Sequence, residues 1–163
     1  MDAYEAITRK RDRREYDGRP IPEESLRRIL QAGRMAGSSS NSQPLRFIVM
    51  RDQAAKDKLA PAGPGTAPLV NAPLGIVICI QKGRRDFDVG RAGQNMMVAA
   101  WAEGIHSCPI GLRNEDVASE ALGLPDDYVA AIGISFGYPS PSATPREPSK
   151  RLDMEELVHY DRW

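Results

Sequence analysis

The chain of 163 residues is poor in cysteine and lacks any long apolar run. Cys79 and Cys108 are its only cysteines, and a chain of this length can bury a core large enough to fold without a disulfide, which fits a reducing compartment. No run approaches the ~20 apolar residues of a membrane span, and residues 1–9 lack the apolar core and cleavage site of a signal peptide. We therefore expect a soluble, cytoplasmic protein that has no membrane partner.

An excess of charge of one sign is also lacking, because 22 lysines and arginines balance 22 aspartates and glutamates. No overall field therefore favours nucleic acid, and any anion binding must be local. The basic residues 9–14 keep a nucleic-acid-binding module open as an alternative, but the neutral total and the few aromatic residues weigh against it. We expect a small-molecule ligand and no nucleic acid.

The sequence also lacks a grouped set of metal ligands. His106 and Cys108 lie close together, but no neighbouring His/Cys pair completes the spacing of a structural zinc site. We therefore expect no metal.

Apolar periodicity and turn residues predict one domain, residues 1–163, in which helices and strands are interspersed. The expected helices cover 2–9, 22–36, 53–60, 88–103 and 114–122, with a helical turn or two within 153–158, and the expected strands cover 47–50, 74–80 and 128–136. The first helix should bury Ala3, Ala6 and Ile7. Residues 74–80 are apolar and rich in β-branched side chains, which predicts a central strand covered on both faces. Because the order mixes helices with non-consecutive strands, we predict an α+β layer architecture rather than a doubly wound fold.

A polar loop, residues 36–47, separates an expected amphipathic helix from an apolar strand. Its residues 38–43 offer more closely spaced donors and acceptors than a tight turn needs, and Pro44 should hold Gln43 in an extended conformation. These features are typical of a binding loop. A capping or surface loop stays open as an alternative, because serine and asparagine favour turns for local reasons.

Several motifs occur in the order and spacing typical of one family: the basic residues 9–14, Tyr16, Pro22, SSSNSQP at 38–44, CPIG at 108–111, and a basic C-terminal segment. With them the chain resembles the FMN-dependent nitroreductase family over nearly its whole length, as a small member with a short lid. The resemblance implies a nitroreductase-like three-layer α-β-α sandwich with a central mixed, mainly antiparallel sheet. It also implies a homodimer with FMN at the subunit interface.

The activity implied by the resemblance is that of an FMN-dependent NAD(P)H oxidoreductase. Hydride would pass from NADH or NADPH through flavin N5 to a small organic acceptor, nitroaromatic or quinone-like, by a ping-pong mechanism. A specialised flavin-dependent dehydrogenase, dehalogenase or flavin-degrading relative stays open, as does a noncatalytic flavin-binding protein.

The N-terminal basic residues and the serine-rich loop match cofactor-binding positions of the family. The resemblance implies that Lys10 and Arg11 engage phosphate and ribityl oxygens and that Arg14 approaches the pyrimidine edge, where positive charge stabilises the reduced flavin. It implies further contacts to FMN across the dimer from Ser38, Ser39 and Asn41. Taken alone, the basic cluster also fits a solvated surface patch.

Two later segments complete the implied site. Pro109 and Ile110 would form an apolar wall along the flavin ring, and the Gly111 backbone would meet N5, so no side chain is assigned as catalytic. Lys150 and Arg151 would reach the phosphate. Standing alone, CPIG also fits a strand-to-helix turn with a buried cysteine, and Lys150 also fits a solvated tail.

Three positions depart from the family pattern: Asp12 replaces a serine, Pro109 replaces a frequent bulky aromatic residue, and Ser149 replaces a frequent basic residue. A carboxylate at position 12 would repel a phosphate unless it pairs with Arg13 or another arginine. The short connection at 81–87 also replaces a longer helical insertion, so we expect a more open pocket.

Overall fold

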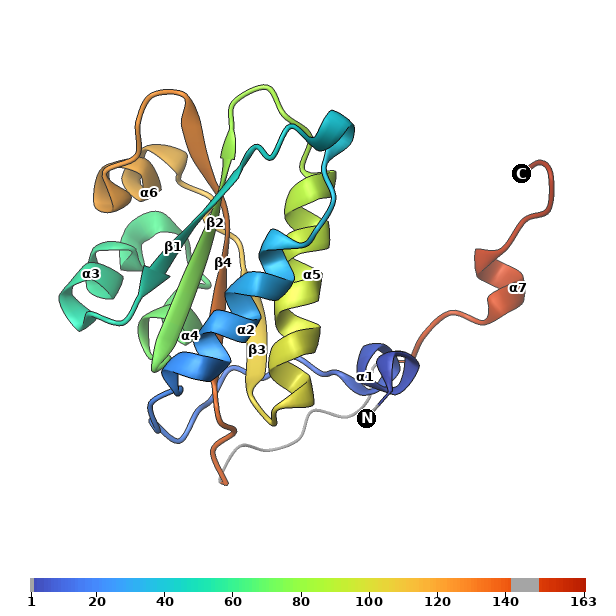
Figure 1. Ribbon diagram of the computed structural model, residues 1–163, viewed down its shortest axis with the longest axis horizontal. Helices are drawn as coiled ribbons and strands as arrows, with labels where there is room; N and C mark the ends of the chain where they lie inside the picture. Colours follow the sequence, from blue (N-terminus) through green and yellow to red (C-terminus); the bar gives the residue numbers. More distant parts are fainter. Residues whose placement is uncertain (1, 142–149) are drawn as a thin grey trace.

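The computed structural model describes residues 2–141 and 150–163 of the chain. Its centre is a four-stranded sheet in the order β1-β2-β4-β3 (Figure 1). The strands are β1 Leu45–Met50, β2 Leu74–Gln81, β3 His106–Ile110 and β4 Tyr128–Gly137. All three strand pairings are antiparallel, and an isolated parallel bridge joins Asp12 to Ser107. The central position predicted for the strand at 74–80 is confirmed.

Helices cover both faces of the sheet (Figure 1). One face carries α2 Glu23–Arg34 and α5 Phe87–Ala102, and the opposite face carries α3 Gln53–Lys58, α4 Ala67–Val70 and α6 Glu115–Leu122. The remaining helices are α1 Ala3–Arg9, α7 Met154–Leu157 and the short 3-10 helices η1 Ser39–Asn41 and η2 Ala60–Ala62. None of the helices in the described part of the chain combines the length and apolar character that a membrane crossing requires. The α+β layers predicted from the sequence are confirmed.

Strand β2 contributes to two separate cores. Ile76 and Ile78 pack beneath α2 and α5, whereas Val77 and Cys79 pack in the core on the opposite face. All four side chains are at most 1% exposed. Full burial of such a side chain stabilises a fold by roughly 1.5–3 kcal/mol, so this doubly covered strand is a main source of stability.

A β-bulge lies where β4 passes β2. Ile78 is opposite Ile132 and Cys79 is opposite Ala130, so Ala131 is an extra residue without a partner in register. An extra residue shifts the alternation of side chains by one position. As a result Ala130 packs in the core beneath α3 and α6, whereas Ile132 packs against the core beneath α5.

Helix α1 packs less of its apolar surface than predicted. Asp2 caps the helix as expected, because its carboxylate accepts the Glu5 N–H at 2.8 Å. Only Ala6 is buried, however, and the burial predicted for Ala3 and Ile7 is wrong, with Ile7 58% exposed. The reason is position, since α1 contacts the end of α5 and lies beyond the layers (Figure 1).

Strand β3 was not among the expected strands, and Pro109 lies within it. Proline cannot donate a backbone hydrogen bond and is found in sheets mainly on edge strands. β3 is an edge strand paired only with β4 among the named strands, and there the proline is accommodated.

The C-terminal segment extends away from the sheet and its covering helices (Figure 1). A capping box starts α7, in which Asp153 and Glu156 satisfy each other's backbone N–H groups. The large apolar side chains of this segment are exposed: Leu152, Met154, Leu157, Val158, Tyr160 and Trp163. They therefore form an apolar surface that the described body of the chain does not cover.

Candidate functional site

The N-terminal basic segment, residues 10–14, lies along the edge strand β3. Lys10 ends α1, and its N–H donates to the Ala6 carbonyl. The chain then bridges β3, where Asp12 pairs with Ser107 and the Arg13 N–H donates to the Ser107 carbonyl at 3.0 Å. Backbone hydrogen bonds thus hold the segment against the strand that carries the CPIG motif.

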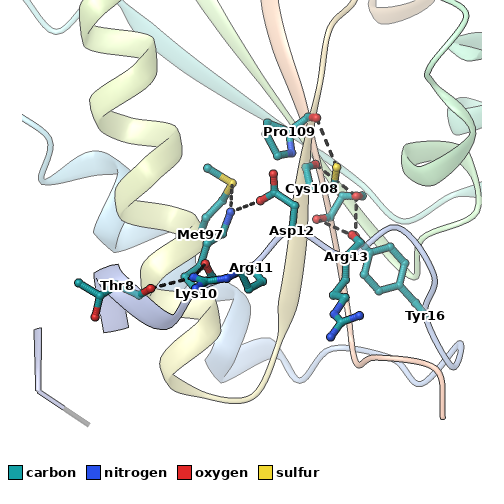
Figure 2. Close-up of polar contacts among 10 residues, drawn as sticks. Thr8, Lys10, Arg11, Asp12, Arg13, Tyr16, Met97, Cys108 and Pro109 are labelled. Atoms are coloured by element: carbon teal, nitrogen blue, oxygen red, sulfur yellow. Dashed lines mark hydrogen bonds and ion pairs between the residues drawn. The ribbon is translucent and has the colours of Figure 1, made fainter. Parts of the chain in front are cut away.

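The ammonium group of Lys10 is held by two side chains (Figure 2). It forms an ion pair with the Asp12 carboxylate and lies 3.4 Å from Met97 Sδ on α5. The Lys10 side chain is only 9% exposed, so this pair is partly shielded from solvent. Asp12 therefore pairs with a lysine, and the pairing with an arginine considered for it is not the one formed.

Figure 2 shows Asp12 between Lys10 and the β3 residues Cys108 and Pro109. A serine hydroxyl at this place could donate a hydrogen bond to an anion, whereas a carboxylate only accepts. Asp12 consequently removes one donor from this region and neutralises the adjacent ammonium charge.

Arg11 and Arg14 point to different surroundings. The Arg11 guanidinium donates to the Thr8 carbonyl at 2.7 Å and to the Lys10 carbonyl at 2.9 Å, where it complements the C-terminal end of α1 (Figure 2). Arg14 is exposed and lies beside the Cys108 thiol. Burial raises the pKa of Cys108, and the nearby Arg14 charge opposes that rise. Arg14 thus lies beside the CPIG segment and forms no ion pair with a described carboxylate.

A buried hydroxyl pair anchors the basic segment to the sheet. The Tyr16 hydroxyl donates to the Arg13 carbonyl at 2.7 Å and lies 2.7 Å from Ser135 Oγ on β4. The Ser135 hydroxyl in turn lies 3.3 Å from the Cys108 carbonyl. Burial raises the pKa of Tyr16 well above its ordinary value, so the phenol is neutral and can serve as a donor.

The end of β3 opens onto free space. Ile110 is 4% exposed and packs in the core, so the accessible part of the strand end is at its neighbours rather than at Ile110. Pro109 is half-buried, and Gly111 is exposed, with no atom within 4 Å of the place a Cβ would take. A flat ligand can therefore approach the backbone at Gly111 closely.

A cavity of about 830 Å³ lies beyond this strand end. A Cβ on Gly63 would stand 3.1 Å from the Gly111 carbonyl oxygen, so the two glycines bring their backbones together. The lining is mainly polar: Pro61, Ala62, Gly63, Pro64, Arg113, Asn114, Glu115 and Asp116. Asn114 uses its side chain to cap α6, accepting the Val117 N–H, and its own N–H donates to the Ala62 carbonyl.

The serine-rich loop adopts an unusual backbone conformation. Ser40, Asn41 and Gln43 have positive φ angles of 52°, 52° and 49°. The extended conformation expected for Gln43 is therefore wrong, because Ser38 Oγ accepts its N–H at 2.9 Å and holds it in the left-handed region. Left-handed non-glycine residues cost roughly 1–3 kcal/mol each and concentrate at functional sites.

A second cavity, of about 460 Å³, joins this loop to the connection between β2 and α5. The loop contributes Ser38, Ser39 and Ser42, and the connection and α5 contribute Gly83, Arg84, Arg85, Phe87, Asp88 and Arg91. The arginines were not predicted as site residues. The adjacent Arg84 and Arg85 in a short connection were the available signal, but only the fold shows that this connection lies beside residue 38.

The family model described as Nitroreductase matches residues 7–79 and 71–138. The chain belongs to the nitroreductase family.

Individual nitroreductase relatives agree with this assignment over the length of the chain. A Thermus thermophilus NADH dehydrogenase is 30% identical over 199 residues, which cover 97% of this chain and 95% of the relative. A nitroreductase family protein from Clostridium difficile 630 matches with a TM-score of 0.88 at 26% identity and covers 100% of both chains. An NADPH:FMN oxidoreductase from Vibrio harveyi, solved with NAD+, matches with a TM-score of 0.88 at 28% identity, covering 98% of this chain and 77% of that one. The nitroreductase-like three-layer fold implied by the sequence is confirmed.

Within this nitroreductase fold the expected site residues fall into three groups. Lys10 and Arg14 lie near the strand end that carries residues 109–111, whereas Arg11 turns back onto α1. Ser38 and Ser39 line the second cavity, and Asn41 is not among its lining residues. Lys150 and Arg151 are exposed at the start of the C-terminal segment. Ser149, the third departure from the family pattern, lies outside the described residues.

Metal binding has no support among the described residues, which contain no group of three or more His, Cys, Asp or Glu side chains suited to an ion. His106 instead packs edge-on against Trp101, with ring centroids 4.6 Å apart. Burial, assisted by Arg13 and Lys10, lowers the pKa of His106 and keeps the imidazole neutral.

Proposed function

We propose that this nitroreductase-family protein is an FMN-dependent NAD(P)H oxidoreductase that reduces a small organic acceptor, nitroaromatic or quinone-like, by a ping-pong mechanism. The observation that carries the proposal is the placement of Arg14 beside the CPIG strand, whose end at Gly111 is open to a planar ligand. The names of the relatives, which include an NADPH:FMN oxidoreductase, support the choice of cofactor and reductant.

The residues near β3 suit FMN in charge and shape. Arg14 supplies a permanent positive charge near the strand end, and Arg11 adds another beside α1. Lys10 is also cationic, but the Asp12 carboxylate already neutralises it. We infer that Arg14 and the basic pair Lys150 and Arg151 supply most of the attraction for the cofactor.

When bound, FMN supplies the hydride chemistry between the nicotinamide and the acceptor. The chain binds and orients the cofactor, and its backbone at Gly111 can donate to a ring nitrogen. Arg14 stabilises negative charge on the adjacent ring, and the half-buried Pro109 excludes water from one side. No side chain needs to transfer a proton as an acid or base in this scheme.

A homodimer with FMN at the subunit interface is part of the proposal. The second cavity contains serine-loop residues but none of the N-terminal basic residues, so a flavin that touches both groups fits a site shared by two copies. The exposed apolar side chains of the C-terminal segment offer surface for the contact, since Leu152, Leu157 and Trp163 are each at least 55% exposed. Exposed Ile7 and Tyr4 on α1 add to it.

A cytoplasmic location is proposed as well. Cys79 and Cys108 are both buried free thiols, which suits a reducing compartment.

The test is the visible spectrum of purified protein supplied with FMN, followed by anaerobic addition of NADH and NADPH in separate samples. Retained flavin that bleaches on addition supports the proposal, and acceptors can then be screened for reoxidation. Arg14→Gln should bind FMN more weakly and bleach more slowly, whereas Arg27→Gln, the same charge change on the α2 surface, should behave as wild type. Protein that retains no flavin contradicts the proposal.

A noncatalytic flavin-binding protein is the second candidate, and the Asp12–Lys10 ion pair is the feature that favours it. Flavin that is retained but stays oxidised with either nicotinamide would identify that role. Product analysis after bleaching distinguishes a general reductase from a specialised dehydrogenase, dehalogenase or flavin-degrading enzyme.

A further inference from the structure

Three arginines converge on the cavity beside the serine-rich loop. Arg84, Arg85 and Arg91 line it together with the hydroxyl residues Ser38 and Ser39. None of the three guanidinium groups forms an ion pair with an acidic residue of the described chain. Asp88 is the acidic side chain in the lining, so the cavity carries an excess of positive charge.

The third arginine is exposed but lies against two neighbouring groups. The Arg91 guanidinium carbon lies 5.7 Å from the centre of the Phe87 ring. A Cβ on Gly37 would also stand 2.9 Å from an Arg91 nitrogen, so the guanidinium lies directly against the backbone of the loop. Arg91 therefore joins the loop to α5 and has a defined orientation.

A tight turn directs the other two arginines to the same place. Gly83 has a φ of 77°, and the Arg84 N–H donates to the Gln81 carbonyl at 3.2 Å. Lys82 is tied by its N–H to the Asp127 carbonyl at 2.8 Å. The turn reverses the chain directly before α5, which places Arg84 and Arg85 in the lining of the cavity.

The loop can supply donors as well. Ser38 Oγ accepts the Gln43 N–H, which leaves the hydroxyl proton available for a ligand. Guanidinium groups and hydroxyls together suit phosphoryl oxygens, because arginine forms paired charge-assisted hydrogen bonds with phosphate. The volume of about 460 Å³ exceeds the size of a single phosphate and lies in the range of small-ligand pockets. Phe87 is 73% exposed and offers a ring face to a base.

We propose that Arg84, Arg85 and Arg91, with the serine hydroxyls, bind the phosphoryl groups of the nicotinamide dinucleotide. This inference rests on the proposed function, because the loop at 38–41 is there placed against the flavin of the partner subunit. A dinucleotide held here by its phosphates has its nicotinamide directed toward that flavin. The connection at 81–87 thus acts as a recognition element for the reductant in place of a longer lid.

The test uses the full chain loaded with FMN and titrates ADP by calorimetry, with inorganic pyrophosphate in a second series. Arg84→Gln combined with Arg85→Gln should weaken ADP binding by about 10-fold to 100-fold, because two charge-assisted contacts are lost. KM for NADH or NADPH should rise by a similar factor while kcat stays near the wild-type value. Arg27→Gln is the matched control and should change neither quantity.

A second variant reports on the pocket without removing a charge. Gly37→Ala should displace the Arg91 guanidinium and weaken ADP binding by about 3-fold to 10-fold, with the melting temperature measured alongside. Equal ADP binding by wild type and both variants would overturn the proposal. If pyrophosphate releases FMN, the cavity is instead the site of the flavin phosphate. If the substitutions change only the kinetics with a carboxylate acceptor such as 4-nitrobenzoate, the cavity is an acceptor site. Either result also overturns the proposal.

These outcomes are separable from failure of the proposed function. ADP titration needs no turnover and can be repeated on protein without flavin, whereas FMN retention and bleaching are read from the spectrum. If the flavin bleaches normally but ADP binds the arginine variants as tightly as wild type, only the dinucleotide site is refuted. If ADP binding depends on the arginines but the protein retains no flavin, only the proposed oxidoreductase activity is refuted.

Discussion

Lys10 and Asp12 form an ion pair that contacts Met97 of α5, so the lysine of segment 10–14 is already neutralised within its own segment. In the fold this pair lies beside the strand that we propose binds FMN. The carboxylate therefore opposes binding of an anionic cofactor in two ways, by repelling it and by occupying the lysine.

Replacing Asp12 by serine should tighten FMN binding. The change removes a negative charge, frees the Lys10 ammonium and adds a hydroxyl donor, so we expect Kd to fall by about 10-fold. Fluorescence quenching of FMN measures this, with riboflavin as a ligand that lacks the phosphate. Asp126→Ser, at an exposed position outside the site, is the control. An equal gain for riboflavin would show that the effect does not act through the phosphate.

Tyr16→Phe should reveal the buried phenol through its pH dependence. Near neutral pH the variant should lose about 1 kcal/mol of unfolding free energy, because the hydrogen bonds of the hydroxyl disappear. Burial raises the folded-state pKa of Tyr16, so its stabilising contribution is complete below the ordinary value near 10 and falls as pH rises above it. The difference in unfolding free energy between wild type and variant should therefore shrink above pH ~10 by up to about 1.4 kcal/mol per pH unit. Urea unfolding at pH 8 and pH 11 measures it, and a constant gap would contradict the assignment.

Gly137→Ala should destabilise the fold through the same tyrosine. A Cβ at this position would stand 2.6 Å from the Tyr16 ring, which must then shift at a cost of about 1–3 kcal/mol. Gly90→Ala is the contrast. Gly90 is an exposed position of α5 where a Cβ meets nothing within 4 Å, so this substitution should stabilise the fold by about 0.5–1 kcal/mol. Thermal or urea unfolding checks both. In combination with Tyr16→Ala, the destabilisation by Gly137→Ala should largely vanish. If the two changes in unfolding free energy are instead fully additive, the contact between position 137 and the Tyr16 ring is contradicted.

Leu152→Ser combined with Leu157→Ser should weaken self-association. Both side chains are more than half exposed, so their loss costs the isolated chain little, but it removes apolar surface from the proposed dimer contact. Sedimentation velocity should show a shift toward monomer at micromolar concentration, accompanied by loss of FMN. Val49→Ser, at another exposed apolar position, should leave the oligomer unchanged. A double variant that sediments as wild type would remove the C-terminal segment from the interface.

Much of the fold was readable from local patterns. The apolar run at 74–80 identified the central strand, and the caps Asp2 and Asn114 marked two helix starts because each side chain accepts a backbone N–H as expected. Edge strand β3 was missed because Pro109 is a poor strand residue unless its missing N–H faces outward, and the edge position depends on the whole sheet.

The site was readable only in part, because its geometry depends on contacts distant in sequence. The basic residues 10–14 and the serine-rich loop could be identified as candidates, but the partner of Asp12 could not, since choosing Lys10 over an arginine depends on where Met97 lies. In the sequence, Arg84 and Arg85 have the pattern of an ordinary charged turn. Their relation to the loop appears only when the turn at Gly83 reverses the chain onto α5.

Pro109 has a consequence beyond the cofactor. It sits on an edge strand, where a proline nitrogen interrupts the row of donors that an incoming strand would need. Residues 12 and 13 pair with the same strand at Ser107, so the missing donor and the N-terminal segment together disfavour the addition of a strand at this edge. We therefore expect contacts of this chain at that edge to use side chains and helices rather than a continuous sheet.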